Sequence, residues 1–372
     1  MSPSPPRHVA DASRRWRNAL ESFLLREWSG GSAAQLVLRP LSWLYRLALA
    51  LRGLPYLASG PRPSGTAAAG LRAPLVVVGN LMVGGSGKTP CVIVLAQALE
   101  ARGWHPGVVA RGYGGRGRVE PVTPRSTADE VGDEPLLVAR RTGRPVWVGP
   151  DRLAAVQALL AAHPEVDVLL SDDGLQNLRL PRDVEIVVVD ARRGLGNRRL
   201  LPAGPLRESL ARLARVDQFW LCGDGVTPVG LPPAPVRVRQ ALARHAQSLA
   251  RPGEYRALSD FAGKDVIAVA GIAAPERFFA MLGAAGVDAR GEAWPDHHPF
   301  VADDLAHLRG RTVLMTQKDA VKCEAFAAAD WWVVPLDAVI PDQAVEAVEA
   351  ALRRVAAQQP AQAGDPAVRT SP

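Results

Sequence analysis

The stretch that decides the fold reads Val76-Val77-Val78-Gly79-Asn80-Leu81-Met82-Val83-Gly84-Gly85-Ser86-Gly87-Lys88-Thr89-Pro90. It runs from β-branched residues, which favour a strand, through a glycine-rich turn into an apolar helical pattern over 92–99. A strand, a glycine-rich loop and a helix in this order are the setting of a phosphate-binding loop. The glycines let the backbone wrap an anion, and the first amides of the helix face it. The sequence therefore predicts a nucleoside triphosphate site.

Within this loop, Lys88 supplies a mobile positive charge for the phosphates, and the Thr89 hydroxyl is placed to bind Mg²⁺. The usual pattern has glycine where Met82 stands, and the double glycine Gly84-Gly85 moves the flexible part inward. A glycine-rich turn without a ligand is the alternative interpretation. The residues expected to bind ATP are Met82, Val83, Gly84, Gly85, Ser86, Gly87, Lys88 and Thr89.

The composition suits a soluble or peripheral protein of two domains, with 372 residues of which 48% are hydrophobic. Three cysteines, Cys91, Cys222 and Cys323, lie far apart and lack the spacing of metal ligands. This pattern indicates a reducing compartment and small buried side chains rather than a disulfide framework.

Positive charge is concentrated at the amino-terminal end. The first 72 residues carry ten arginines and three acidic residues, which accounts for the whole net charge of +7. A nucleic-acid-binding face would extend over the folded domain, so we expect no nucleic-acid partner. No sequence feature indicates an obligate protein partner either.

Residues 34–58 form an apolar segment interrupted by arginines, too broken for a spanning helix. Leucines at helical spacing predict an amphipathic helix, with Pro40 as its first residue. Arg39, Arg46 and the ring of Trp43 suit a helix lying in the headgroup region of an anionic membrane surface. A helix packed on its own domain explains the same pattern, and both interpretations stay open.

From residue 75 onward, short apolar strands alternate with helices, which predicts a parallel α/β sheet covered by helices on both faces. A proline-rich stretch at 228–235 marks a boundary before a smaller α/β unit. The expected divisions are an extension (1–33), the amphipathic helix (34–58), a P-loop nucleotide-binding core (59–228), a smaller domain (229–357) and a tail (358–372). The expected strands are 76–78, 107–110, 145–148, 166–170, 184–189, 265–272, 312–316 and 331–335, with helices at 91–102, 151–162, 275–285 and 342–357.

Carboxylates follow two of the expected strands. Asp172 and Asp173 come shortly after 166–170, and Asp190 directly follows 184–189. The carboxyl edge of a parallel sheet is where a phosphate-binding fold places its magnesium ligands and water-orienting groups. Asp172 and Asp173 have an alternative role in capping a turn, and Asp190 has one in pairing with the arginines at 192 and 193.

Four further segments carry reactive or charged side chains. Arg111 lies in a glycine loop and is placed to meet a phosphate, although glycine clusters mostly mark turns. Asp133 precedes an apolar helix, and its alternative role is to cap that helix. A proline-rich turn presents Arg207 and Glu208. The pair His297-His298 lacks metal-site spacing, so it suits proton handling or a surface role.

Taken together, these segments resemble the tetraacyldisaccharide 4'-kinase family, the lipid A 4'-kinases of Gram-negative envelope synthesis. The resemblance covers roughly residues 25–355 and departs from the family pattern at Gln317 and Asn177. The resembling segments, in the family's order, are 40–45, 78–90, 111–115, 132–135, 171–176, 201–208, 296–297 and 316–322.

The resemblance implies transfer of the ATP γ-phosphoryl group to the 4'-hydroxyl of a tetraacylated glucosamine disaccharide 1-phosphate. The acylated lipid substrate implies work at a membrane, at the cytoplasmic face of the inner membrane, by a peripheral or monotopic protein held through the amino-terminal helix. ATP and Mg²⁺ are the implied cofactors.

The resemblance also implies roles for single residues. Lys88 and the loop amides hold the phosphates, while Asp172 and Asp173 organise the site. Asp133, assisted by His297, accepts the proton of the sugar hydroxyl, and closure of the two domains would bring this pair together. The expected magnesium environment is Thr89, Gln176 and Glu208, and the expected substrate contacts are Arg111 and Arg207.

Three other classes of protein share part of the pattern. A partitioning ATPase would carry lysine where Val83 stands, and a GTPase would carry Asn-Lys-x-Asp, which the stretch 316–319 does not match. A membrane scaffold that only holds nucleotide is the third class. Only a kinase makes a phosphorylated lipid, so that product distinguishes the four.

Overall fold

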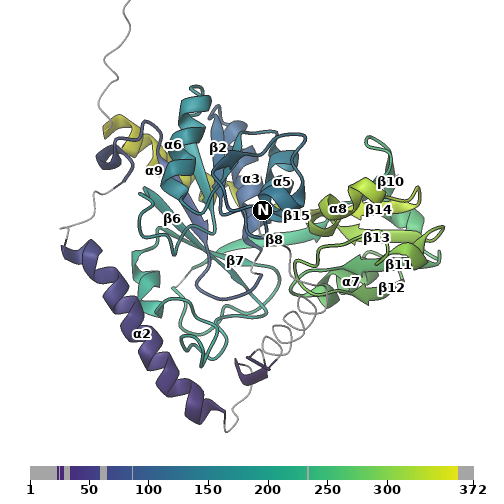
Figure 1. Cartoon of the computed structure of the whole chain (residues 1–372), viewed down its shortest axis with the longest axis horizontal. Coiled ribbons are helices and arrows are strands. Elements are labelled where there is room, and N and C mark those ends of the chain that lie inside the picture. Colours follow the sequence, from purple (N-terminus) through teal and green to yellow (C-terminus); the bar gives the residue numbers. More distant parts are fainter. Residues whose placement is uncertain are drawn as a thin grey trace, which may run out of the picture.

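The computed structural model describes residues 23–24, 26–28, 34–58, 65–85, 87–232 and 234–358. Figure 1 shows two α/β units side by side, with a long helix, α2, along the flank of the larger one. The expected extension (1–33), the expected tail (358–372), residues 59–64 and the loop residue Ser86 lie wholly or mostly outside the described residues.

The larger unit is built on a sheet with nine strands in the described part of the chain, in the order β15-β8-β7-β6-β1-β5-β2-β4-β3. The strands from β8 through β4 pair in parallel, and β15 and β3 are antiparallel additions at the two edges. This arrangement confirms the expected parallel α/β fold. The strands are β1 (Leu75–Gly79), β2 (Pro106–Ala110), β3 (Glu120–Pro121), β4 (Val146–Val148), β5 (Val168–Asp172), β6 (Val184–Asp190), β7 (Gln218–Cys222), β8 (Val236–Leu242) and β15 (Leu336–Val339).

Alternate side chains of β1 divide between two hydrophobic cores. Val76 and Val78 pack with helices α3 (Lys88–Glu100), α5 (Asp133–Thr142) and α9 (Asp342–Gln358). Val77 points to the opposite face, where α6 (Arg152–Ala162) packs. Because every residue of β1 is buried, an unbroken apolar run is what this position requires. The three cysteines are buried, as expected, and the sulfur atoms of Cys91 and Cys222 lie 3.4 Å apart.

Helix α3 begins at Lys88, three residues earlier than the sequence pattern predicted. Gly87 precedes it with a φ of +79°, a left-handed conformation that glycine adopts without strain. Pro90 falls in the first turn, where a missing N–H costs nothing. The phosphate loop therefore runs directly into the helix.

The smaller unit has a sheet of six strands among the described residues, in the order β10-β9-β14-β13-β11-β12. Helix α7 (Pro275–Ala284) packs on β11 and β12, and α8 (Gln317–Cys323) follows β13 and contacts α5 of the larger unit. The strands are β9 (His245–Ser248), β10 (Tyr255–Ala257), β11 (Val266–Ala270), β12 (Ala289–Ala293), β13 (Thr312–Thr316) and β14 (Trp331–Val334).

The chain enters the smaller unit through β8 and returns through β15, and these two strands pair with each other. Within residues 229–357, which the sequence predicts as the smaller domain, β8 and β15 extend the first sheet and α9 packs in its core. The pairing of β8 with β7 draws this part of the segment back to the larger unit. Where one folding domain ends and the next begins stays a prediction.

Helix α2 (Gln35–Ala58) confirms the predicted helix, and Pro40 lies within it rather than at its start. The carbonyl that Pro40 leaves without a partner belongs to Leu36, whose side chain is 75% exposed, so water can satisfy it. Among the described residues, none of the helices combines the length and hydropathy that crossing a bilayer would require.

Candidate active site

The phosphate loop leaves β1 at Gly79 and is held by contacts on both sides. The Asn80 side chain accepts a hydrogen bond from the Met82 amide at 2.5 Å, which folds the start of the loop. Arg193 donates to the carbonyls of Gly85 (3.0 Å) and Val83 (3.3 Å). Gly84 has a φ of +94°, which a side chain would strain. The loop is thus fixed by hydrogen bonds together with the packing of Leu81 and Met82 in the hydrophobic core.

Lys88 and Asp173 form the charged centre beside the loop. The Lys88 ammonium lies 3.6 Å from Asp173, which also receives two hydrogen bonds from the Arg207 guanidinium at 3.1 and 3.2 Å. Burial raises the pKa of Asp173, but the charges of Lys88 and Arg207 more than offset it, so the net pKa is lowered. Asp173 therefore stays ionised and holds two cations next to the loop.

Asp172, the last residue of β5, accepts a hydrogen bond from the Thr89 hydroxyl at 3.1 Å. Complete burial, together with the charge of Glu134, raises the pKa of Asp172 to about 7. Its other oxygen, Oδ1, is buried without a hydrogen-bond partner in the described structure. An orphaned buried carboxylate oxygen is suited to a cation.

Gln176 and Glu208 form a second polar pair. The Gln176 amide donates to Glu208 (2.9 Å) and to the Asn80 carbonyl (3.0 Å), while Gln176 Oε1 is buried without a partner in the described part of the chain. Of the residues expected around magnesium, the structure joins Thr89 to Asp172 and Gln176 to Glu208. Within the described ranges, no three His, Cys, Asp or Glu side chains gather as a metal-binding group.

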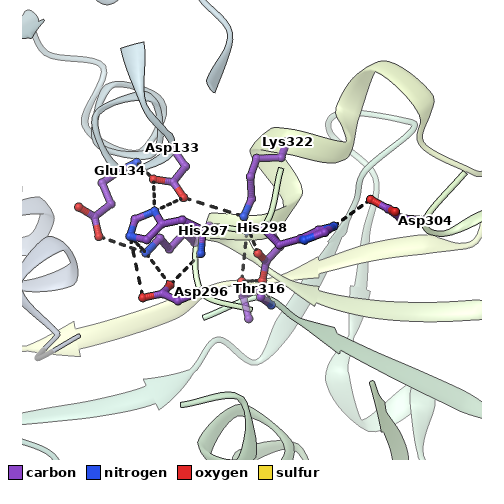
Figure 2. A network of polar contacts seen from close by, with 11 residues as sticks. Asp133, Glu134, Asp296, His297, His298, Asp304, Thr316 and Lys322 are labelled. Atoms are coloured by element: carbon purple, nitrogen blue, oxygen red, sulfur yellow. Dashed lines mark hydrogen bonds and ion pairs between the residues drawn. The ribbon is translucent and has the colours of Figure 1, made fainter. Parts of the chain in front are cut away.

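Asp133 and His297 meet across the boundary between the two units (Figure 2). Asp133 is the first residue of α5, preceded by Gly132 with a φ of +90°. His297 follows β12 in the smaller unit, and its Nδ1 lies 3.0 and 3.2 Å from the two Asp133 oxygens. His297 has a φ of +57°, a left-handed conformation that is costly for a non-glycine residue and clusters at functional sites. The ring of Tyr113 packs edge-on against His297.

The two members of this pair shift each other's pKa in opposite directions. Burial raises the pKa of Asp133, but the hydrogen bond with His297 and the charges of Lys318 and Lys322 lower it to a net value below the ordinary one. Burial lowers the pKa of His297, but the contact with Asp133 outweighs it, and the net pKa is raised. Each partner thus stabilises the charged form of the other.

One arginine near the loop was missed by the sequence interpretation. Arg152, at the start of α6, is 4% exposed, and its charge acts on Asp172 and Asp173. Burial lowers its pKa to about 10. Its Nε has no partner among the described residues. Its place after β4, at the carboxyl edge of the sheet, was the available signal.

Other expected residues are placed as follows. Arg111 is exposed, and its positive charge contributes to lowering the pKa of Arg152. Asp190 has its alternative role, since it accepts hydrogen bonds from the backbone amides of Arg192 and Arg193 and forms an ion pair with Arg277 at 2.8 Å. His298 turns away from His297 toward Asp304, at 2.9 Å (Figure 2).

A glycine-rich loop opening a helix, a lysine beside it and carboxylates at the strand ends define a P-loop phosphotransferase, and an Asp–His pair joins its two units. A family model described as tetraacyldisaccharide-1-P 4'-kinase matches residues 34–353. The chain belongs to the tetraacyldisaccharide 4'-kinase family. This membership confirms the resemblance and the expected class of enzyme.

Similar curated proteins, each named tetraacyldisaccharide 4'-kinase, come from several bacteria. One from Methylobacillus flagellatus is 43% identical over 90% of this chain and 96% of its own length. One from an Azoarcus species is 48% identical over 86% and 93%. A solved structure of the Aquifex aeolicus enzyme, an "apo" form LpxK in complex with ATP, is 25% identical with a TM-score of 0.70, covering 86% of this chain and 99% of that one.

Proposed function

We propose that this protein transfers the γ-phosphoryl group of ATP to the 4'-hydroxyl of a tetraacylated glucosamine disaccharide 1-phosphate, a step of lipid A biosynthesis. The observation that carries the proposal is the Asp133–His297 contact, formed between the two units of a chain whose phosphate loop carries the Lys88–Asp173 ion pair. A switch ATPase needs no such pair, because its nucleophile is water and not a sugar hydroxyl. The name and ATP complex of the related structure support ATP as the donor.

In this proposal Lys88 and the amides of the loop hold the β- and γ-phosphates, and Arg207 and Arg111 contact the anionic substrate. Asp173 fixes both Lys88 and Arg207 before the substrate arrives. Phosphoryl transfer depends mainly on positioning and charge neutralisation, so one such cluster suffices. Arg152, with its unpartnered Nε, adds positive charge behind the carboxylates.

The proton of the sugar hydroxyl passes to Asp133 as the new oxygen–phosphorus bond forms and ADP leaves. The lowered pKa makes Asp133 a weak base, but in a loose transition state the hydroxyl loses its proton late, so a weak, well-oriented acceptor is enough. His297 orients that carboxylate through its Nδ1 contact.

We also propose Mg²⁺ as a cofactor, because oxygen donors of the kind it prefers face the loop without partners. The orphaned Asp172 Oδ1 and Gln176 Oε1 join the Thr89 hydroxyl and Glu208 as its surroundings. When bound, the ion would neutralise phosphate charge during transfer.

We propose that α2 places the enzyme on the cytoplasmic face of the inner membrane as a peripheral or monotopic protein. The helix contacts the larger unit through polar groups: Ser42 donates to Leu200 and Leu201, and Tyr45 donates to Arg207. Most of the described apolar side chains are exposed, with Trp43 72% exposed and a stripe of leucines and a valine beside it. The exposed stripe consists of Leu36, Val37, Leu41, Trp43, Leu44, Leu47 and Leu51.

A basic hollow next to α2 supports the same orientation. Its volume is about 480 Å³, and none of the described residues that line it is acidic. Four arginines line it: Arg39, Arg46, Arg198 and Arg199. Guanidinium groups beside an exposed apolar stripe match the phosphates and acyl chains of an anionic bilayer surface.

Incubation of the purified protein with labelled ATP and the disaccharide lipid tests the activity. We expect phosphorylated lipid from the wild type and at least a hundredfold less from Lys88→Ala, because the loop loses its charge on the γ-phosphate. Lys264→Ala changes a lysine that precedes β11 and lies over the ring of Phe261; it is the matched control and should keep wild-type turnover. Wild-type ATP hydrolysis without any lipid product would exclude the kinase.

A further inference from the structure

Lys318 lies in α8, the helix of the smaller unit that contacts α5 of the larger unit. It is the second residue of α8, and only 17% of its side chain is exposed. Its ammonium lies 3.0 Å from Nε2 of His297, 3.2 Å from Asp296 and 3.3 Å from Glu134. It therefore contacts the ring nitrogen that faces away from Asp133.

These contacts determine which ring nitrogen carries the proton. An ammonium group has three donors and no acceptor, so Nε2 must accept the hydrogen bond from Lys318. A neutral imidazole has one N–H, which then has to be on Nδ1. Nδ1 is the atom that lies 3.0 and 3.2 Å from the Asp133 oxygens. The two contacts select the same tautomer.

Resting on the proposed function, we propose that Lys318 is a positioning residue: it holds His297 as the neutral Nδ1–H tautomer, which orients Asp133 and leaves that carboxylate to take the substrate proton. With the ammonium on Nε2, the ring has no lone pair free for the sugar hydroxyl. The proton therefore moves from the hydroxyl to an Asp133 oxygen as the bond to phosphorus forms and the bond to ADP breaks.

The surrounding charges keep Lys318 in this role. Burial alone would lower the pKa of Lys318, but Glu134, Asp133 and Asp296 outweigh it and raise the pKa, so the donor remains charged at any working pH. On the His297 ring, Asp133 and Asp296 favour a second proton and Lys318 opposes it. The other groups that face the cluster are Tyr113, packed on the ring, and Lys322, which lies 3.9 Å from Asp133 and 2.8 Å from Asp319.

Lys318→Met tests the proposal in the full-length protein, because it removes the charge and the donor but keeps an unbranched side chain. The ¹⁵N resonances of labelled histidine report the tautomer, and the His297 signals are those lost in His297→Gln. We expect Nδ1 protonated and Nε2 unprotonated in the wild type at pH 8. In Lys318→Met we expect the pKa of His297 to rise by about one unit or more, since a like charge 3 Å away is gone.

Activity gives the second readout. In Lys318→Met the acidic limb of the kcat profile should move to higher pH by the same amount, because an imidazolium makes Asp133 a poorer acceptor, while KM for ATP stays within twofold. Lys318→Arg should keep the wild-type tautomer and profile, and Lys264→Met serves as the remote control. An unchanged His297 spectrum, or a kcat that falls equally at every pH, would overturn the proposal.

A replacement variant is available in case Lys318→Met is unstable. If Lys318→Met does not fold, Lys318→Gln replaces it: its neutral amide removes the like charge, so the pKa of His297 should still rise. An unchanged pKa of His297 in that variant would also overturn the proposal. The spectra need no turnover, so a wild type that makes no phosphorylated lipid would reject the kinase without deciding the tautomer.

Discussion

At the scale of single residues, the Asp133–His297 pair shows how two ordinary side chains acquire unusual properties. Their contact lowers the pKa of Asp133 and raises the pKa of His297. The strained backbone of His297 indicates that the surrounding structure stabilises a conformation the residue would not choose. The contact exists only while the two units are together.

This pair predicts a pH-dependent contribution to stability. The folded pKa of His297 is raised above its unfolded value, so its stabilisation is fully present below about pH 6.5 and is lost as the pH rises through the folded pKa. Asp133 stays ionised over this range and adds no slope. The Tm difference between the wild type and His297→Gln should be larger at pH 6 than at pH 9, by roughly 1 to 3 °C.

Thermal unfolding followed by circular dichroism at both pH values measures that difference. The variant His307→Gln, which changes an exposed histidine paired with Glu292, is the control for general effects of pH. A His297→Gln difference that is the same at pH 6 and pH 9 would contradict the raised pKa.

At the scale of elements, α2 has an arrangement opposite to that of most surface helices. Ser42 and Tyr45 bind the larger unit through hydrogen bonds, whereas most of the described leucines of the helix are exposed. The amphipathic pattern was readable from the sequence, but both interpretations of it predicted the same helix. The side facing the protein is decided by hydrogen bonds to the 199–207 loop, which no periodicity shows.

The exposed leucines predict membrane binding that can be weakened without loss of stability. In Leu44→Ser/Leu47→Ser, two side chains that are 63% and 56% exposed lose apolar surface, and we expect partitioning to anionic vesicles to fall about tenfold. The Tm should stay within about 1 °C, because neither leucine packs on the protein.

Vesicle sedimentation and thermal unfolding together measure both effects. Val226→Ser/Val229→Ser, which changes two side chains that are 88% and 83% exposed outside α2, is the matched control and should partition like the wild type. Equal partitioning of the leucine variant and the wild type would return α2 to a purely structural role.

Other elements differ in how far the sequence could predict them. β1, the loop and α3 follow from local patterns, since their hydrophobic run, glycines and helix lie together. β8 reads Val-Arg-Val-Arg-Gln-Ala-Leu after a proline-rich stretch, and its partner β15 lies about ninety residues further on. A half-polar strand with so distant a partner gives no local signal.

The residues of the candidate site also differ in how far the sequence could predict them. Lys88, Thr89 and Asp172 were predicted because a motif or a strand end marks each of them. Arg152 and Lys318 were not, because each stands in the first turn of a helix, where a basic residue is usually exposed. Their burial comes from packing between elements far apart in the chain.

At the scale of the whole molecule, the smaller unit is an insertion between two neighbouring strands. Leu242, the end of β8, is directly opposite Leu336, the start of β15. The segment between them forms its own sheet and its own hydrophobic cores. The larger unit should therefore be able to fold without it.

Replacing residues 243–335 by Asn-Gly tests this expectation. A two-residue turn suits adjacent antiparallel strands, and β8, β15 and α9 would keep their places in the first core. We expect a protein that unfolds cooperatively in circular dichroism but makes no phosphorylated lipid, because His297 and Lys318 are missing. Loss of a cooperative transition would show that the larger unit depends on the smaller one.

The contacts of α2 have a geometric consequence for the choice of acceptor. Ser42 and Tyr45 bind the backbone of the loop that carries Arg207 and Glu208. The Arg207 side chain in turn binds Asp173, and Glu208 binds Gln176. With the helix seated among lipids, as proposed, those few bonds fix the height of the γ-phosphate above the acyl chains. A hydroxyl that lies nearer to or farther from the bilayer would not reach the γ-phosphate. The enzyme therefore selects its acceptor hydroxyl by distance from the membrane as well as by shape.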